Sequence, residues 1–317
     1  MQDLKPQIYG PTDGDAWWVL QDRIRILVSG EQSGGAYAVG VSEVPPGAGP
    51  PPHVHAAEDE LFYLFEGQLL WTLADKQYQG VAGDTVYLPR GIPHTFRNNG
   101  NVPAKFLLIA TPSGFERFVA SVGVSCPSGG RLDPPPITPQ AIQALMAGAP
   151  QAGIEILPDY QFGPMAELPR HRESLWVLGH HVLVKLTAEQ TRGGFSVVEI
   201  TSPPGAGIPP HRHSREDELF YVLEGDFTFD IEGVSYAAPA GTFVRIPRGV
   251  WHAPVNTGSG PGRMIDIHTP GGFEGFFREC GTPCTDISAG PPAADVDMDR
   301  MAAILAGHGM EIRVPRT

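Results

Sequence analysis

The sequence is poor in cysteine, in basic residues and in long hydrophobic runs, and each shortage excludes a class of protein. Its three cysteines, Cys126, Cys280 and Cys284, form no CxxC pair, which argues against a disulfide framework and a thiolate zinc site. No run approaches the roughly 18 consecutive apolar residues of a membrane span. With 22 Lys and Arg against 35 Asp and Glu, the net charge of −13 repels phosphate backbones and anionic lipids. We therefore expect neither a nucleic acid nor a membrane as partner.

The first residues, 1–6, lack the charged-then-apolar pattern of a secretory signal. Together with the odd number of cysteines, this predicts a cytoplasmic location. The spacing Cys280-x3-Cys284 is compatible with a metal or redox pair. Two small residues near a helix end is the simpler interpretation.

The sequence has instead 39 glycines and 33 prolines, which separate short apolar runs at regular intervals. This pattern is typical of an all-β protein with many tight turns. A parallel α/β sheet would need long crossover helices, and none is visible. The runs that we expect to be strands include Ile24–Val28, Gln68–Leu73, Thr85–Leu88 and Phe106–Ile109.

The chain contains an internal repeat that covers most of its length. A shift of 158 residues places Trp18–Leu20 on Trp176–Leu178 and Pro45–Gly49 on Pro203–Gly207, without an insertion. A period of this length indicates a duplicated domain rather than a solenoid. The fold class predicted is therefore all-β, with two tandem jelly-roll β-barrels and short flanking helices.

A stiff proline run at residues 134–136 marks the connector between the two copies. We expect a first domain over residues 1–150, which includes a proline-rich and helical connector, and a second domain over residues 151–317 with a helical tail. In the connector, Thr138 as N-cap and Pro139 at the first helical position predict a helix that ends at Gly148. Further helices are expected at Asp299–Leu305, Phe115–Val119 and Phe273–Arg278.

Four residues of the first half form a candidate metal site. His53 and His55 are two apart, so on a strand both imidazoles point to the same face. Glu60 follows across a turn and can supply a carboxylate oxygen, and a neighbouring antiparallel strand can bring His94 to the same point. Three imidazoles and a carboxylate suit Fe, Mn, Co, Ni, Cu or Zn, and suit Ca or Mg poorly.

The second half repeats this set of residues at the same spacing, which makes a chance arrangement a poor explanation. His211, His213, Glu218 and His252 each lie 158 residues after their counterparts, so six of the eleven histidines occupy matched positions. A lone histidine is more often a surface or core residue than a ligand, but eight candidate ligands recurring together favour a metal. The competing interpretation is a protein that retains the fold and these residues but has no catalytic activity.

At this point the sequence resembles a known family. The pattern Gly47-x5-His53-x-His55-x4-Glu60-x6-Gly67, followed by Gly83-x5-Pro89-x-Gly91-x2-His94-x3-Asn98, is similar to the two conserved motifs of the cupin superfamily, and the second half matches them equally. The whole chain resembles a bicupin. The stretches Glu216–Gly225 and Thr269–Phe277 are most similar to quercetin 2,3-dioxygenase-like cupins.

The resemblance implies one divalent transition metal in each barrel, with Fe²⁺ as the first expectation and Ni²⁺, Mn²⁺, Co²⁺, Cu²⁺ or Zn²⁺ as the others. It implies a dioxygenase that uses O2 on a small aromatic or enolic substrate, which binds through a deprotonated oxygen. By that analogy Glu60 and Glu218 are catalytic as well as ligating, because either can take the substrate proton.

Pocket residues follow from strand parity and from differences between the halves. Phe62 shares parity with Glu60, as Phe220 does with Glu218, and Phe96 follows His94 by two. An inward phenylalanine in a barrel is more often core than pocket. Trp251 replaces a proline of the first half. Asp266 and His268 replace Leu108 and Ala110, and they are an acid–base pair beside the metal if their strand faces inward.

Two other functions remain open on the sequence. In the first, the same metal acts as a Lewis acid in an isomerase, lyase, decarboxylase or hydrolase that needs no O2. In the second, the chain is a non-catalytic bicupin that binds a small molecule. A monomer and a homodimer are equally compatible with two fused domains.

Overall fold

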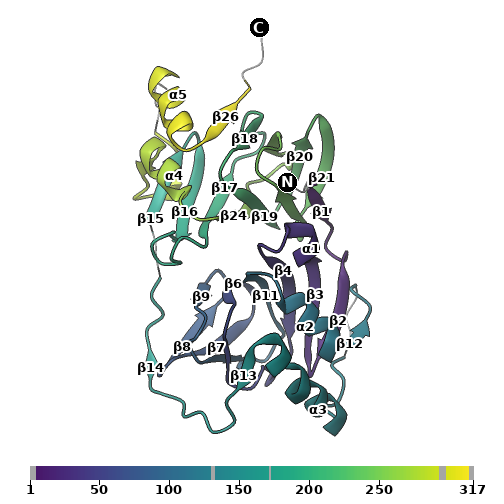
Figure 1. Cartoon of the computed structure of the whole chain (residues 1–317). Coiled ribbons are helices and arrows are strands. Elements are labelled where there is room, and N and C mark those ends of the chain that lie inside the picture. Colours follow the sequence, from purple (N-terminus) through teal and green to yellow (C-terminus); the bar gives the residue numbers. More distant parts are fainter. Residues whose placement is uncertain (1–4, 130–132, 171–172, 293–297, 314–317) are drawn as a thin grey trace. The chain divides into compact units, whose positions relative to one another are not determined.

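The computed structural model describes residues 5–129, 133–170, 173–292 and 298–313. The chain forms two compact units (Figure 1). The first comprises Thr12–Arg170, and the second comprises Lys5–Pro11 together with the chain from residue 173 onward. Each unit is built mainly from antiparallel strands, as the glycine and proline pattern predicts.

The first unit consists of two sheets. The seven-stranded sheet has the order β12-β2-β3-β4-β11-β6-β9, and the six-stranded sheet has the order β13-β5-β10-β7-β8-β14. The strands are β2 (Asp15–Val19), β3 (Asp22–Val28), β4 (Ala38–Val44), β5 (His53–His55), β6 (Asp59–Glu66), β7 (Gln68–Leu73), β8 (Lys76–Val81), β9 (Thr85–Leu88), β10 (His94–Arg97), β11 (Ala104–Thr111), β12 (Val124–Cys126), β13 (Ile154–Ile156) and β14 (Met165–Ala166).

The second unit repeats this arrangement. Its eight-stranded sheet has the order β1-β22-β19-β24-β17-β16-β15-β25, and its five-stranded sheet has the order β21-β20-β23-β18-β26. The strands are β1 (Gln7–Tyr9), β15 (Glu173–Val177), β16 (His180–Leu186), β17 (Ser196–Ser202), β18 (His211–His213), β19 (Asp217–Glu224), β20 (Asp226–Ile231), β21 (Val234–Pro239), β22 (Phe243–Ile246), β23 (His252–Asn256), β24 (Gly262–Thr269), β25 (Thr282–Pro283) and β26 (Met310–Ile312).

The core of each unit lies between its two sheets, which is the jelly-roll arrangement that the sequence predicts. Strand β16 alternates strictly between buried and half-buried residues, as a strand with one face in the core must. In the first unit Phe62 of β6 packs against Trp71 of β7, which belongs to the opposite sheet, with ring centroids 5.2 Å apart. Over the described parts of the chain, the two sheets of a unit are not joined into one continuous hydrogen-bonded barrel.

The compact units divide the chain differently from the expected boundary after residue 150. The segment after it returns to the first unit, because β13 pairs with β5 and β14 pairs with β8. The N-terminal strand β1 instead pairs with β22 and belongs to the second unit. These pairings depend on short strands that carry little pattern of their own.

All four expected helices are confirmed, as α2 (Phe115–Val122), α3 (Pro139–Gly148), α4 (Glu274–Cys280) and α5 (Met298–Gly307). Thr138 is the N-cap of α3 and accepts a hydrogen bond from the backbone of Ala141, with Pro139 at the first position. The remaining helical segments are α1 (Gly30–Ser33) and the 3₁₀ turns η1 (Pro150–Ala152) and η2 (Ile287–Ala289).

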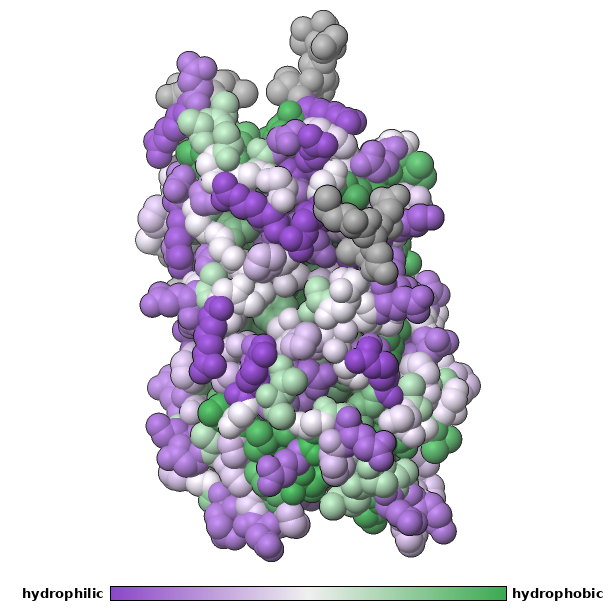
Figure 2. Space-filling view, in the orientation of Figure 1, coloured by the Kyte–Doolittle hydropathy of each residue, from purple (hydrophilic) through white to green (hydrophobic). Residues whose placement is uncertain are grey.

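The surface is mixed in character. Figure 2 shows hydrophilic residues over much of the visible face, with hydrophobic residues gathered toward the lower part of the view. The three cysteines are free thiols. Among the described residues, no helix has both the length and the apolar character to cross a bilayer.

Candidate metal centres

The predicted ligands of the first unit converge. One ligand atom from each of His53, His55, Glu60 and His94 lies within 4.8 Å of all the others. The sheet pairing explains this, because His94 of β10 is directly opposite His53 of β5 in an antiparallel pair. Glu60 reaches the same point from β6 in the facing sheet. Its Oε2 lies 3.1 Å from Nε2 of His94 and 3.6 Å from Nε2 of His55.

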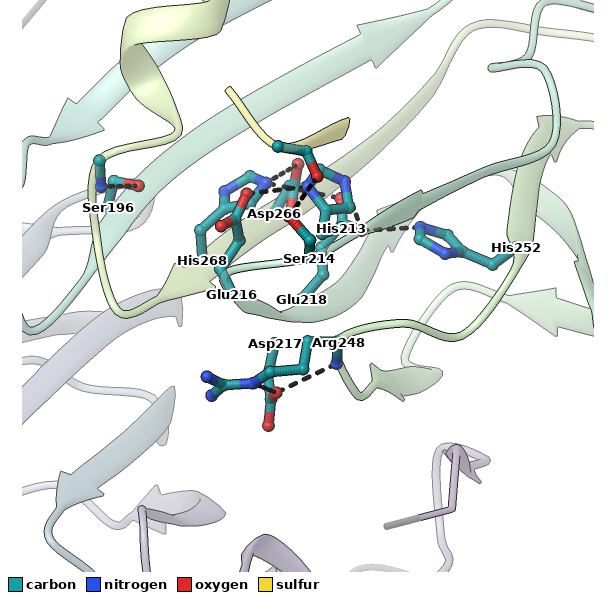
Figure 3. A network of polar contacts seen from close by, with 12 residues as sticks. Ser196, His213, Ser214, Glu216, Asp217, Glu218, Arg248, His252, Asp266 and His268 are labelled. Carbon is teal, nitrogen blue, oxygen red and sulfur yellow. Dashed lines mark hydrogen bonds and ion pairs between the residues drawn. The ribbon is translucent and has the colours of Figure 1, made fainter. Parts of the chain in front are cut away.

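The second unit has the same centre. His211, His213, Glu218 and His252 satisfy the same 4.8 Å condition, and His211 is directly opposite His252 across β18 and β23. Oε2 of Glu218 lies 2.7 Å from Nε2 of His252 and 3.3 Å from Nε2 of His213. Figure 3 shows the two imidazoles reaching the Glu218 carboxylate from different sides.

Hydrogen bonds fix which nitrogen of each imidazole faces the centre. In the first unit Nδ1 of His53 lies 2.8 Å from the carbonyl of Pro51, and Nδ1 of His94 lies 2.9 Å from the carbonyl of Ile92. A carbonyl can only accept, so each Nδ1 carries the proton and each Nε2 presents a lone pair. His211 and His252 make the equivalent contacts with the carbonyls of Pro209 and Val250.

The third imidazole of each centre is held by a glutamate that the sequence analysis missed. Nδ1 of His55 lies 2.9 Å from Glu58, and Nδ1 of His213 lies 2.9 Å from Glu216. A carboxylate on the outer nitrogen orients a metal-binding imidazole and makes it a stronger ligand. The sequence repeat could have identified these two glutamates, because Glu58 and Glu216 also occupy matched positions at the 158-residue shift.

In both units the loop beside the centre is held by the same backbone hydrogen bond. The backbone N–H of Gly91 donates to the carbonyl of His55 at 2.8 Å, and Gly249 donates to His213 at 2.7 Å. Both glycines have positive φ, 76° and 85°, a conformation that residues with a side chain rarely adopt. This turn places the last histidine of each set.

The second centre contains orphaned atoms that fit a cation. Nε2 of His211, His213 and His252 and Oε2 of Glu218 are buried and have no hydrogen-bond partner among the described residues. His252 and Glu218 approach to 2.7 Å without hydrogen-bond geometry. Buried polar atoms without partners are costly, and a metal ion between them would satisfy all four. Three imidazoles and a carboxylate suit a divalent transition metal.

The pKa shifts of His53 and Glu60 favour the protonation states that a metal needs. For His55 burial lowers the pKa, but Glu60 and Glu58 outweigh it and raise the pKa above its usual value. Burial and the neighbouring imidazoles of His94 and His55 lower the pKa of His53 to about 3, so it is neutral at pH 7. Burial alone would raise the pKa of Glu60, but His55 and His94 outweigh it and lower that pKa to about 2. Neutral imidazoles and an ionised carboxylate are the ligating forms.

Asp266 and His268 distinguish the second centre. Both lie on β24, where His268 is directly opposite Glu218 of β19, so their strand faces inward. Nε2 of His268 lies 3.5 Å from Oε1 of Glu218 and 3.6 Å from Oδ2 of Asp266 (Figure 3). Burial disfavours the imidazolium, but Asp266 and Glu218 outweigh it and raise the pKa of His268 to about 9.

Each centre opens into a cavity within its own unit. The first cavity is lined by His53, His55, Glu60 and His94 and also by the predicted pocket residues Phe62 and Phe96. The second is lined by His211, His213, Glu218 and Asp266. Three predicted pocket residues are not among its lining residues: Phe220 and His268, which are buried, and Trp251.

Trp251 points elsewhere for a simple reason. It is the residue before His252, and because neighbouring side chains of an extended chain point to opposite faces, it faces away when His252 faces inward. Its ring lies under the guanidinium groups of Arg212 and Arg313, 4.9 and 3.9 Å from their central carbons.

These observations define a duplicated jelly-roll protein with a His3Glu cluster in each half. Comparison with known families agrees, because residues 40–110 and residues 198–268 each match the model of the cupin domain. The chain belongs to the cupin superfamily and is a bicupin, with two cupin domains in tandem.

Among curated proteins, the chain is similar to quercetin 2,3-dioxygenase of Bacillus subtilis, with 26% identity over 299 residues that cover 89% of this chain and 88% of that protein. A shorter match, 34% identical, joins 23% of the chain to 36% of germin-like protein 1-1 of Oryza sativa. Among solved structures, oxalate decarboxylase of Lactobacillus farciminis in a formate complex has a TM-score of 0.58 at 16% identity, covering 85% of this chain and 88% of that one.

A structure of Bacillus subtilis oxalate decarboxylase, a protein with Mn(II) centres, has a TM-score of 0.58 at 18% identity and covers 97% of this chain and 89% of that one. At these identities the structural likeness shows the fold alone.

Proposed function

We propose that the chain is a metal-dependent oxidoreductase, a dioxygenase of the quercetinase type that acts on a small aromatic or enolic substrate. The observation that carries this is the convergence of three imidazoles and one carboxylate at the base of an apolar cavity, in both units. The likeness to quercetin 2,3-dioxygenase over most of both chains supports it.

The residues that would hold the metal are the two His3Glu sets, His53, His55, Glu60 and His94 in the first unit and His211, His213, Glu218 and His252 in the second. A divalent transition metal there would supply Lewis-acid polarisation of a chelating substrate oxygen and redox chemistry toward O2. Four protein ligands leave room for further ligands on a six-coordinate ion. Fe²⁺ is the metal that we propose first for these sites.

The protein residues supply position, proton transfer and exclusion of water. Glu60 and Glu218 are the carboxylates within reach of a substrate oxygen at the centre, and either can take the proton of an enol as it ionises. The cavity walls are largely apolar, so they exclude water and strengthen the interaction between charges at the centre.

The test is oxygen uptake by the metal-loaded protein with quercetin as the probe. The proposal predicts consumption of O2 that requires both the metal and the substrate, and no product under nitrogen. Product formation at the same rate under nitrogen, or with Zn²⁺ as the metal, would instead establish a non-oxidative cupin enzyme.

That alternative has one observation in its favour. The first cavity has a free volume of only about 80 Å³, which suits a molecule of a few atoms rather than an aromatic ring system. Metal-assisted decarboxylation, isomerisation or hydrolysis of a small acid would fit there. A panel of small carboxylic acids under nitrogen tests it directly.

A further inference from the structure

The two cavities differ far more than their ligand sets do. The first has a free volume of about 80 Å³ and the second about 520 Å³. Cavities that hold drug-sized ligands typically measure about 300–1,000 Å³. Only the second is within that range.

Side chains at matched positions explain part of the difference. In the first unit Trp71, Phe96 and Phe106 pack with Phe62 in one aromatic cluster, in which the rings of Trp71 and Phe96 are 5.2 Å apart. At a shift of 158 residues these three become Phe229, Pro254 and Met264. Smaller side chains therefore stand where three large aromatic groups fill the interior of the first unit.

The helices that border the cavities also differ. Leu145 of α3 lines the first cavity and is buried. The second cavity is bordered by α5, where Met301 and Leu305 are half-buried and Ala302 and Ala306 are exposed. Ala302 and Ala306 thus contribute short, exposed side chains to the lining of the second cavity.

The wall of the second cavity suits a flat ring. Phe273 and Phe276 stack with centroids 4.9 Å apart and an interplanar angle of 19°, and Phe277 meets Phe273 edge to face. All three line the cavity, and Phe273 lies against the ligand His213, with ring centroids 4.5 Å apart. Asp266 adds a buried carboxyl whose Oδ1 has no hydrogen-bond partner among the described residues.

We propose that, of the two cavities, the second alone admits the bulky planar substrate of the proposed function, with Asp266 as a hydrogen-bonding group for one of its hydroxyls. This rests on the proposed function and specifies where its substrate binds. The first centre is restricted to small ligands by the aromatic cluster Phe62, Trp71, Phe96 and Phe106. The two centres thus have the same set of metal-binding residues but admit substrates of different size.

The experiment counts bound substrate. The chain is loaded with metal, and quercetin binding is measured under nitrogen by equilibrium dialysis, so that turnover does not interfere. We expect one quercetin per chain although two metal centres are present. Two equivalents per chain of equal affinity, or none, would overturn the inference.

Variants on one helix locate the bound molecule. Ala302→Trp and Ala306→Trp place a large ring at the mouth of the second cavity and should raise the Kd for quercetin at least tenfold. Ala303→Trp is the matched control, because Ala303 is exposed on the same helix and does not line the cavity. It should change the Kd by less than twofold, and equal effects of all three substitutions would contradict the assignment.

A further variant separates this inference from the proposed dioxygenase activity. His211→Ala should abolish quercetin binding, and retention of full binding in this variant would overturn the inference. One bound quercetin without any O2 uptake would contradict the dioxygenase and leave the assigned cavity intact. O2 uptake with two equivalents bound would contradict the cavity and leave the dioxygenase intact.

Discussion

Oε1 of Glu216 lies 2.9 Å from Nδ1 of His213, and the same contact joins Glu58 to His55 in the first unit. The glutamate orients the imidazole so that Nε2 faces the centre, and its negative charge makes that nitrogen a better donor to a cation. The contact is buried, because His213 and Glu216 are only 2% and 5% exposed.

Glu216→Gln should lower the metal affinity of the second centre about 10–100-fold, and Glu58→Gln should do the same in the first. The amide keeps the shape of the side chain and removes its charge, so the fold should remain. A titration against a competing chelator measures each Kd. Glu66→Gln, on an exposed residue at the end of β6, is the control. Unchanged affinity in both variants would mean that these glutamates are only structural.

Asp22 gives the protein a pH-dependent stability. It is 8% exposed and lines the first cavity, and burial raises the pKa of its carboxyl to about 7. Below about pH 3 the carboxyl is protonated in both the folded and the unfolded chain, so it has no effect. As the pH rises toward 7 the unfolded chain ionises first, and the folded state loses up to roughly 4 kcal/mol.

Asp22→Asn should therefore stabilise the metal-free protein at pH 8 and leave it unchanged near pH 3. Urea unfolding at the two pH values measures the difference. Asp75→Asn, at an exposed position, should alter stability by no more than about 0.5 kcal/mol at either pH. A destabilised Asp22→Asn variant at pH 8 would show that the ionised carboxylate has a stabilising partner in the folded protein.

Removal of the metal should lower the melting temperature. A ligand present at 100 times its Kd stabilises the folded state by about 2.7 kcal/mol, which corresponds to several degrees for units of this size. The unpartnered buried atoms of His211, His213, His252 and Glu218 are the reason to expect it. Calorimetry with and without a chelator gives the shift, and readdition of the metal should reverse it. Identical melting curves would argue against bound metal.

His252→Ala should abolish chemistry in the second unit and leave its fold intact. Among the described residues its Nε2 has no hydrogen bond to lose, and its Nδ1 loses only the contact with the carbonyl of Val250. Circular dichroism and thermal unfolding of the metal-free variant should match those of the metal-free parent within about 1 kcal/mol. An unfolded variant would give His252 a structural role instead.

Much of the site could be predicted because the sequence states it twice. The period-two spacing of His53 and His55 fixes a shared face, and the duplication makes coincidence a poor explanation. The sequence leaves the direction of Asp266 and His268 open, since parity is counted from a strand start that the sequence does not mark. Their positions opposite Phe220 and Glu218 decide it.

Other features depend on contacts between distant segments. The pairing of β1 with β22 and of β13 with β5 joins short strands far apart in the chain, which local patterns cannot register. The difference between the halves predicts Trp251 in the pocket, but its parity relative to His252 directs its side chain away. The unequal cavity volumes result from packing among many residues and have no single sequence signal.

The most direct test of the central claim is the number of metal ions per chain after purification and equilibrium dialysis with Fe²⁺ or Mn²⁺, measured by mass spectrometry. Convergence of the two His3Glu sets predicts two ions per chain, and one ion in each of His53→Ala and His211→Ala. No bound ion, or two ions retained in both variants, would contradict it.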